Sequence, residues 1–202
     1  MYASLILVGI AIVVFIIQAA VSGFTQAFAL VSADVLTRPW ILVTSIFLHG
    51  DIAHLLYNML GLGLFGMILE SIVGKKRFLV IFFAGGLLAG IGTSFLYSAA
   101  LGASGALMAV LGVLAALRPH MQVFVSFIPM PMWVAAGFWA AGDFIGLFVP
   151  TGVANLAHLI GLGFGLGVGF YLRKDFGQLR PGREILHIDD KEFEDWEKKW
   201  MK

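Results

Sequence analysis

Two polar side chains inside long apolar stretches are suited to act together. Ser104 lies in Gly102-Ala103-Ser104-Gly105-Ala106, directly before a stretch that carries no charge until Arg118. A hydroxyl with small neighbours at the mouth of a buried helix indicates a nucleophile. His158 lies inside another apolar stretch, where an ionisable side chain is costly unless it has a function. A serine activated by a histidine forms covalent intermediates, so the pair predicts proteolysis within a membrane.

The two side chains are expected at nearly the same depth. Ser104 is 14 residues from Arg118, and His158 is 15 residues from Arg173, the basic residues at the inner ends of their helices. At roughly 1.5 Å per residue, these separations are about 21 and 22 Å. In a hydrocarbon core roughly 30 Å thick, both groups lie less than about 10 Å below the outer surface. A catalytic pair at this depth needs a water-filled cavity that opens outward.

Small residues would let the two helices approach each other. They recur on both: Gly161, Gly165 and Gly169 below the histidine, and Gly105, Ala109 and Gly112 after the serine. Helices with such grooves pack with their backbones close together, which permits a short Ser–His contact. The alternative is that the small residues only pack two spans and that His158 forms an ordinary hydrogen bond between helices.

A second histidine and an asparagine lie on another apolar stretch. His54 and Asn58 are four residues apart, so they share one face of a helix near its outer end, with His49 just before it. Their side chains could donate hydrogen bonds to a developing oxyanion. The competing interpretation is half of a metal site, but the His-Glu-x-x-His pattern of zinc proteases is absent here. We therefore expect neither a metal nor a cofactor.

Asp143 is a further intramembrane charge, besides Glu70 near the inner end of its span. Asp143 could orient a histidine, or it could hydrogen-bond a neighbouring helix, and the second interpretation is preferred. An aspartyl intramembrane protease would need a second buried aspartate, and Asp51 lies at the mouth of a helix. The chain contains no cysteine, which excludes thiolate nucleophiles, disulfides and cysteine metal sites.

The composition is that of a multispan membrane protein. Of the 202 residues, 60% are hydrophobic and only 12% are charged, against roughly 25% charged in soluble domains. Apolar stretches of roughly spanning length predict six helices in an all-α bundle: 3–21, 52–73, 78–99, 104–117, 131–148 and 153–172.

The basic residues predict the topology of this bundle. They follow the second, fourth and sixth stretches, while the alternate connections carry only Arg38. By the positive-inside rule, both termini are cytoplasmic, and the protein lies in the cell membrane. No basic stripe outside the inner loops could follow a phosphate backbone, so nucleic acid is excluded as a partner.

The chain divides into a membrane domain, residues 1–173, and a charged cytoplasmic tail, residues 174–202. In the tail, Phe193, Trp196 and Trp200 share one helical face, which predicts an amphipathic helix resting on the inner leaflet rather than a partner-binding motif. The long outer connection, residues 22–48, is expected in the membrane interface. Residues 121–130 are expected to form an extended inner loop, with Pro131 starting the fifth helix.

Taken together, these motifs resemble the rhomboid family of intramembrane serine proteases. The resemblance rests on Gly102-Ala103-Ser104-Gly105, on Ala157-His158-x-x-Gly161-x-x-x-Gly165, and on His49, His54 and Asn58, and it covers nearly the whole six-span core. Arg38-Pro39-Trp40, Glu70 and residues 74–78 also resemble the family pattern. One departure is Ile41 after Trp40, where many members have arginine.

The resemblance implies a Ser104–His158 dyad that needs no carboxylate, so Asp143 has no catalytic role. It further implies an oxyanion site made by His54, Asn58 and the Ser104 backbone amide, with Gly102 shaping the loop before the nucleophile. The implied substrates are single-span membrane proteins cleaved near the outer membrane face, with the fifth helix as lateral gate. Two alternatives are a noncatalytic rhomboid-like protein that binds membrane clients, and a small transporter, for which no inverted repeat is visible.

Overall fold

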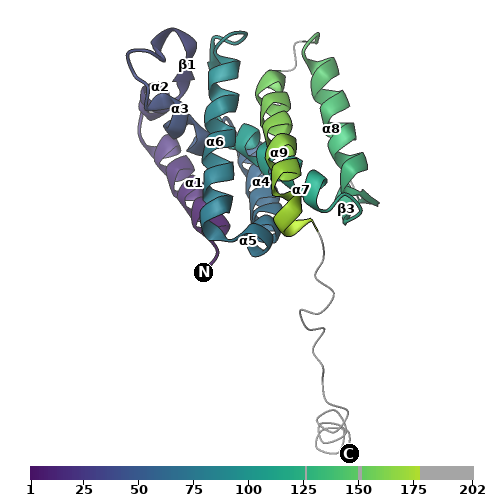
Figure 1. Cartoon of the computed structure of the whole chain (residues 1–202). Coiled ribbons are helices and arrows are strands. Elements are labelled where there is room, and N and C mark those ends of the chain that lie inside the picture. The colour runs from purple at the N-terminus through teal and green to yellow at the C-terminus, as the bar shows by residue number, and fades with distance from the viewer. Residues whose placement is uncertain (126, 150–151, 178–202) are drawn as a thin grey trace, which may run out of the picture.

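The computed structural model describes residues 1–125, 127–149 and 152–177, and it is mainly helical (Figure 1). Six long helical segments lie where the apolar stretches predict them. They are α1 (Ala3–Ala20), a continuous segment of α4 (Ile52–Gly61), the π-helical turn η3 (Leu62–Gly66) and α5 (Met67–Val73), then α6 (Lys75–Thr93), α7 (Ser104–Leu117), α8 (Met132–Gly146) and α9 (Asn155–Phe176). The predicted amphipathic helix of the tail lies outside the described residues.

Short elements form the connections. Between α1 and α4 lie α2 (Phe24–Phe28), β1 (Leu30–Val31), η1 (Ser32–Asp34), α3 (Ile41–Thr44) and η2 (Ser45–Phe47). β1 pairs in antiparallel register with β2 (Ala99–Ala100), which joins this outer connection to the loop before α7. The predicted extended inner loop is an antiparallel hairpin of β3 (Gln122–Val125) and β4 (Ile128–Pro131), and Pro131 directly precedes α8.

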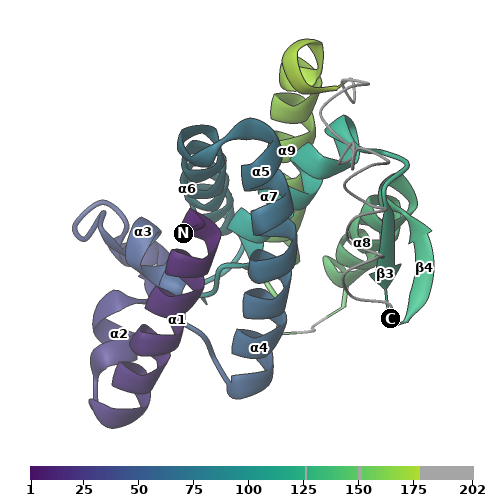
Figure 2. The same cartoon turned by 90° about the horizontal axis from the view of Figure 1, so that it is seen from below.

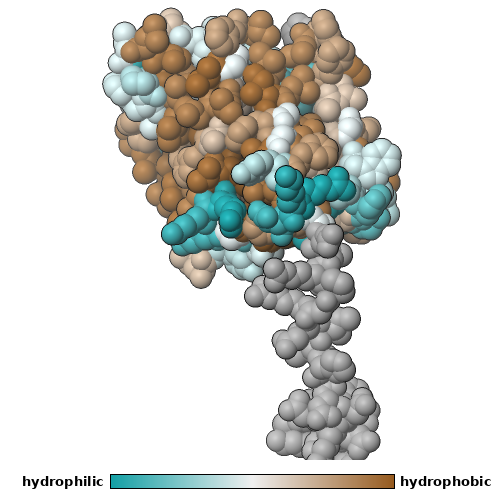
Figure 3. Space-filling view, in the orientation of Figure 1, coloured by the Kyte–Doolittle hydropathy of each residue, from teal (hydrophilic) through white to brown (hydrophobic). Residues whose placement is uncertain are grey.

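Four of the helical segments are long and apolar enough to cross a membrane: α1, α4 to α5, α6 and α9. The other two are shorter, with 14 residues in α7 and 15 in α8. On the face seen in Figure 3, hydrophobic residues cover the helical body and hydrophilic residues gather at its lower end. The N-terminus and the end of α9 both lie at that lower end (Figure 1).

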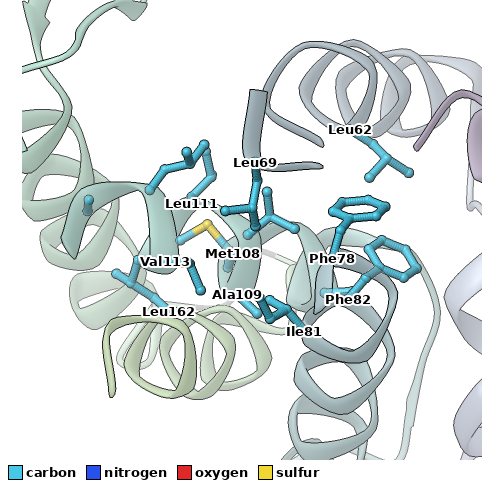
Figure 4. Packing of buried hydrophobic residues seen from close by; sticks show 14 of the residues in the cluster. Leu62, Leu69, Phe78, Ile81, Phe82, Met108, Ala109, Leu111, Val113 and Leu162 are labelled. Atoms are coloured by element: carbon cyan, nitrogen blue, oxygen red, sulfur yellow. The ribbon is translucent and has the colours of Figure 1, made fainter. Parts of the chain in front are cut away.

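Helix α7 forms the centre of the molecule. Twelve of its 14 residues are buried, and the view from below shows it enclosed by the other long helices (Figure 2). Met108, Ala109 and Leu111 pack with Phe78 and Phe82 of α6 and with residues of the other helices in one hydrophobic cluster (Figure 4). A residue on α7 is therefore held in place by packing around most of its helix.

The small residues of α7 and α9 bring the two backbones together, as the sequence predicted. A Cβ atom added to Gly161 would lie 2.1 Å from the carbonyl oxygen of Gly105, and one added to Gly165 would lie 2.1 Å from that of Ala109. Neither position has room for a side chain. Glycine is thus required along α9 by the close approach of α7.

Side chains hold both ends of α1. At its start, the buried Glu70 carboxylate accepts hydrogen bonds from the backbone N–H groups of Ala3 at 2.8 Å and Ser4 at 2.9 Å. These N–H groups have no partner within their helix, and a negative charge is favourable at a helix N-terminus. At the other end, the Gln18 amide donates to the carbonyl of His49 and accepts from its N–H, at 3.2 and 3.0 Å.

The outer connection is anchored without the arginine that many rhomboid sequences have at position 41. Arg38 pairs with the Asp34 carboxylate and donates to the carbonyls of Gln26 and Ala27. Ile41 is fully buried in a small cluster with Leu30 and Leu42. Apolar burial therefore holds this segment in place of the arginine that the family resemblance leads us to expect.

Candidate active site

Ser104 and His158 are in hydrogen-bonding contact. The serine Oγ lies 2.8 Å from the histidine Nε2, although the two residues are 54 positions apart in the chain. Ser104 is the first residue of α7, and His158 lies in the first turn of α9. The close packing of these helices brings the hydroxyl and the imidazole together, at the distance expected for a nucleophile and its general base.

The other nitrogen of His158 contacts Asp143. The Asp143 Oδ1 lies 2.8 Å from His158 Nδ1, and the side chains are only 11% and 17% exposed. Asp143 therefore does contact a neighbouring helix, as the sequence suggested, but it does so through the histidine of the candidate pair. The arrangement Ser104–His158–Asp143 departs from the carboxylate-free dyad that the family resemblance implied.

The start of α7 also offers a backbone donor beside the serine. The first N–H groups of a helix have no acceptor within the helix, and they form the positive end of its dipole. Because Ser104 is the first residue of α7, its amide lies at this end. A negative oxygen that forms next to the hydroxyl would be stabilised there.

His54 of α4 lines the same cavity as Ser104, and one of its ring nitrogens is available to donate. The Gly50 N–H donates to His54 Nδ1 at 3.4 Å, which favours the tautomer with the proton on Nε2. A Cβ atom added to Gly102 would lie 2.8 Å from that Nε2, so the ring lies against the loop before Ser104. Gly102 also has a φ of +121°, which L side chains rarely adopt.

Asn58 lies one turn below His54 and is buried. Its Nδ2 donates to the His54 carbonyl at 2.9 Å, which uses one of its two N–H bonds. The second N–H can serve another acceptor. His54, Asn58 and Ser104 all line the same cavity, so the structure brings together the residues that the sequence assigned to an oxyanion site.

The cavity has a volume of about 1030 Å³, at the upper end of the range for small-molecule sites. Its walls come from α4, the loop before α7, α7 itself, α8 and the start of α9, and they include Tyr57, Leu111, Phe138 and Trp139. Trp139 of α8 meets Phe65 of η3 edge to face, with ring centroids 6.4 Å apart. The polar groups thus lie in a largely apolar chamber between α4 and α8.

His49 is a buried histidine whose ring packs against that of His54. It is 2% exposed, its Nδ1 lies 3.3 Å from the Phe47 carbonyl, and its ring meets that of His54 edge to face at 5.1 Å. Burial, together with the nearby His54, lowers the pKa of His49 to about 4. The ring is therefore neutral at physiological pH.

Sequence reasoning missed Gln18, which fixes the His49 backbone. Its signal was an amide near the outer end of an otherwise apolar first stretch.

Within the described residues, no group of three or more His, Cys, Asp or Glu side chains could hold a metal ion.

The comparisons with known proteins agree on one family. Residues 36–175 match the rhomboid domain. The chain is 31% identical over 171 residues to Rhomboid protein 1, mitochondrial, of Saccharomyces cerevisiae, covering 79% of this chain and 49% of that protein. It is 28% identical over 143 residues to YdcA of Bacillus subtilis, covering 65% of this chain and 66% of YdcA.

A third relative, the rhomboid protease GluP of Bacillus subtilis, is 44% identical over 77 residues, covering 37% of this chain and 15% of GluP. The chain thus spans about half the length of the yeast relative and about two thirds of YdcA. The matched domain includes all the residues of the candidate site and both helices that carry the Ser–His contact. This chain belongs to the rhomboid family.

Proposed function

We propose that this chain is an intramembrane serine endopeptidase that cleaves single-span membrane proteins near the outer membrane face. The observation that carries the proposal is the 2.8 Å contact between Ser104 Oγ and His158 Nε2 inside a cavity of about 1030 Å³. A noncatalytic protein that only binds membrane clients has no need for a hydroxyl paired with an imidazole.

The reaction follows from the positions of these groups. Ser104 Oγ attacks the scissile carbonyl while His158 Nε2 accepts its proton, and the same histidine returns that proton to the leaving amine. The oxyanion is held by the Ser104 amide and by the side chains of His54 and Asn58. Water in the cavity then hydrolyses the acyl-enzyme, with His158 again as the base.

The substrate must present an extended segment to the serine. Backbone groups inside a membrane are normally satisfied within a helix, so a spanning substrate must unwind before its carbonyl can be attacked. Helix-breaking residues near the outer end of the substrate favour this step. The segment would enter between α4 and α8, where the cavity walls are mostly apolar.

All six long helical segments are assigned to the membrane in this proposal, with both termini cytoplasmic. Basic residues begin α6 directly after α5, follow α7 at Arg118 and occupy the last turn of α9, on the side where the N-terminus also lies. The short α7 lies at the centre of the bundle, and the bilayer can thin locally beside the 15-residue α8 at its edge. Residues 1–173 are assigned to the protease domain and residues 174–202 to a cytoplasmic tail.

The test is cleavage of a single-span reporter protein in liposomes. Ser104→Ala should abolish cleavage and labelling by a fluorophosphonate, while its thermal midpoint stays close to that of the wild type. Ser94→Ala is the matched control, because the Ser94 hydroxyl donates only to the Gly90 carbonyl of its own helix, and it should remain active. Cleavage by Ser104→Ala near the wild-type rate would remove Ser104 as nucleophile. A wild-type protein that binds the reporter without cleaving it would establish the noncatalytic alternative.

A further inference from the structure

The Asp143 carboxylate contacts the imidazole of His158. It lies on α8, His158 lies on α9, and their contact at 2.8 Å joins the two helices inside the cavity wall. Among the described residues, His158 is the hydrogen-bonding partner of the Asp143 carboxylate. A charged side chain in an apolar helix is costly, so a carboxylate aimed at one imidazole nitrogen indicates a role at that nitrogen.

The contact determines which ring nitrogen carries the proton. A carboxylate accepts hydrogen bonds and does not donate, so Nδ1 must hold the proton when it faces Asp143. In a neutral imidazole, Nε2 is then the unprotonated nitrogen. That nitrogen faces Ser104, and it is the one that must accept the hydroxyl proton.

Resting on the proposed protease function, we infer that Asp143 is a positioning residue: its carboxylate holds His158 in the tautomer and orientation in which Nε2 accepts the proton of Ser104. When His158 becomes an imidazolium, the same carboxylate balances its charge. The site thus works as a serine–histidine–aspartate arrangement whose third member comes from α8.

The other titratable side chains around the cavity differ from Asp143 in the contacts that they make. The other titratable side chains that line the cavity are Asp51, His54, Tyr57 and Tyr97. The Asp51 carboxylate accepts a hydrogen bond from the backbone N–H of His54, where it caps α4. His54 accepts the Gly50 N–H on its Nδ1, so its Nε2 is left as a donor and cannot accept a hydrogen bond from His158.

The experiment measures kcat and KM for cleavage of the single-span reporter by the full chain in liposomes, and the rate of fluorophosphonate labelling. Asp143→Asn keeps the size of the side chain but removes its charge, and its NH₂ group can impose the wrong tautomer. We expect kcat and the labelling rate to fall together by roughly 10²- to 10⁴-fold, with KM within about threefold of the wild type.

Asn155→Ala is the matched control. The Asn155 side chain donates to the Gly146 carbonyl at 2.9 Å, so it also ties α9 to α8, but through an acceptor other than Asp143. This variant should lower the thermal midpoint and leave kcat within about threefold of the wild type. If Asn155→Ala lowered kcat as much as Asp143→Asn, the Asp143 contact would be a structural tie and the inference would be overturned.

The result also separates this inference from the proposed function. An active wild type with an equally active Asp143→Asn overturns the inference alone, whereas an inactive wild type overturns the proposed function. Should Asp143→Asn fail to fold, Asp143→Glu and Asp143→Gln provide a pair of equal length that differs in charge. Higher kcat in Asp143→Glu supports the positioning role, and equal kcat in the two contradicts it.

Discussion

At the residue scale, Gly102 shows how little space surrounds the nucleophile. Its backbone has a φ of +121°, and the position of its missing side chain is taken by the ring of His54. Glycine is therefore required at this position for two reasons: the backbone conformation, and the lack of space for a Cβ atom beside the His54 ring. The lack of a Cβ atom matters for the oxyanion site, because it lets the His54 ring lie against the loop that precedes Ser104.

Gly102→Ala should lower kcat strongly, because a Cβ atom would push the His54 Nε2 out of reach of the oxyanion. Loss of one oxyanion donor costs roughly 10²- to 10³-fold in kcat. Gly23→Ala is the control: Gly23 has a φ of +82° and no atom within 4 Å of an added Cβ. It carries the backbone strain without the clash and should keep its kcat. A Gly102→Ala variant with wild-type turnover would exclude this placement of His54.

The pairing of Ser104 with His158 could be predicted because depth along two helices follows from residue counts to the basic anchors. The histidine partner of Asp143 was only the less favoured of two interpretations, since one sequence does not say which neighbour a helix turns a given face toward. Gln18 was missed for the same reason: its partner, the His49 backbone, is 31 residues away. The metal interpretation of His54 had no support in the sequence beyond the lone histidines.

At the element scale, the α7–α9 contact sets the distance between nucleophile and base. Glycines of α9 alternate between two environments: Gly161 and Gly165 lie against carbonyl oxygens of α7, whereas an added Cβ at Gly163 or Gly167 meets nothing within 4 Å. The same helix therefore contains both critical and permissive glycines, two residues apart.

Gly165→Ala should force α9 away from α7, because its Cβ would lie 2.1 Å from the Ala109 carbonyl oxygen. Overpacking of this kind costs roughly 1–3 kcal/mol, so the thermal midpoint and cleavage should both fall. Gly163→Ala should leave both unchanged or raise the midpoint slightly, since alanine favours a helix over glycine. Equal thermal midpoints for the two variants would contradict the observed close approach.

The positions of the six long helical segments were predictable from apolar length alone. The hairpin of β3 and β4 was predicted only as an extended loop, because its weak alternation and its prolines exclude a helix but do not specify a partner strand. The pairing of β1 with β2 joins segments about 70 residues apart, and nothing local in either segment indicates it. The π-helical turn η3 also has no clear signal in an apolar run.

At the scale of the whole molecule, burial of a neutral histidine makes stability depend on pH. The pKa of His49 is about 4 in the folded protein and 6.5 in its unperturbed state. The free energy of unfolding that comes from burying His49 in its neutral form is therefore complete above pH 6.5. It is lost as the pH falls toward 4, with an upper bound of about 3 kcal/mol. His49→Gln should flatten the decline of the thermal midpoint between pH 7 and pH 4.5. The same substitution at the exposed His120 should not, and an unchanged slope in His49→Gln would contradict the buried neutral state.

The proposed topology can be tested by labelling, because the chain has no cysteine of its own. A cysteine placed at Lys76, in the first turn of α6, should react with a membrane-impermeant maleimide only from the cytoplasmic side. Asp34→Cys, in the outer connection, should react only from the opposite side. Reaction of both from one side would contradict the assignment of α4 and α5 to a membrane span.

The attachment of α1 has a consequence for the synthesis of the protein. Its first N–H groups bind Glu70, which is 66 and 67 residues later in the chain, and its other end is held through the backbone of His49. When α1 leaves the ribosome, neither partner has emerged, so the helix enters the bilayer with both ends unattached. It can dock only once the second span has been inserted. The order of assembly is therefore fixed by the order of the sequence, and a nascent chain halted before residue 70 would hold an undocked first helix.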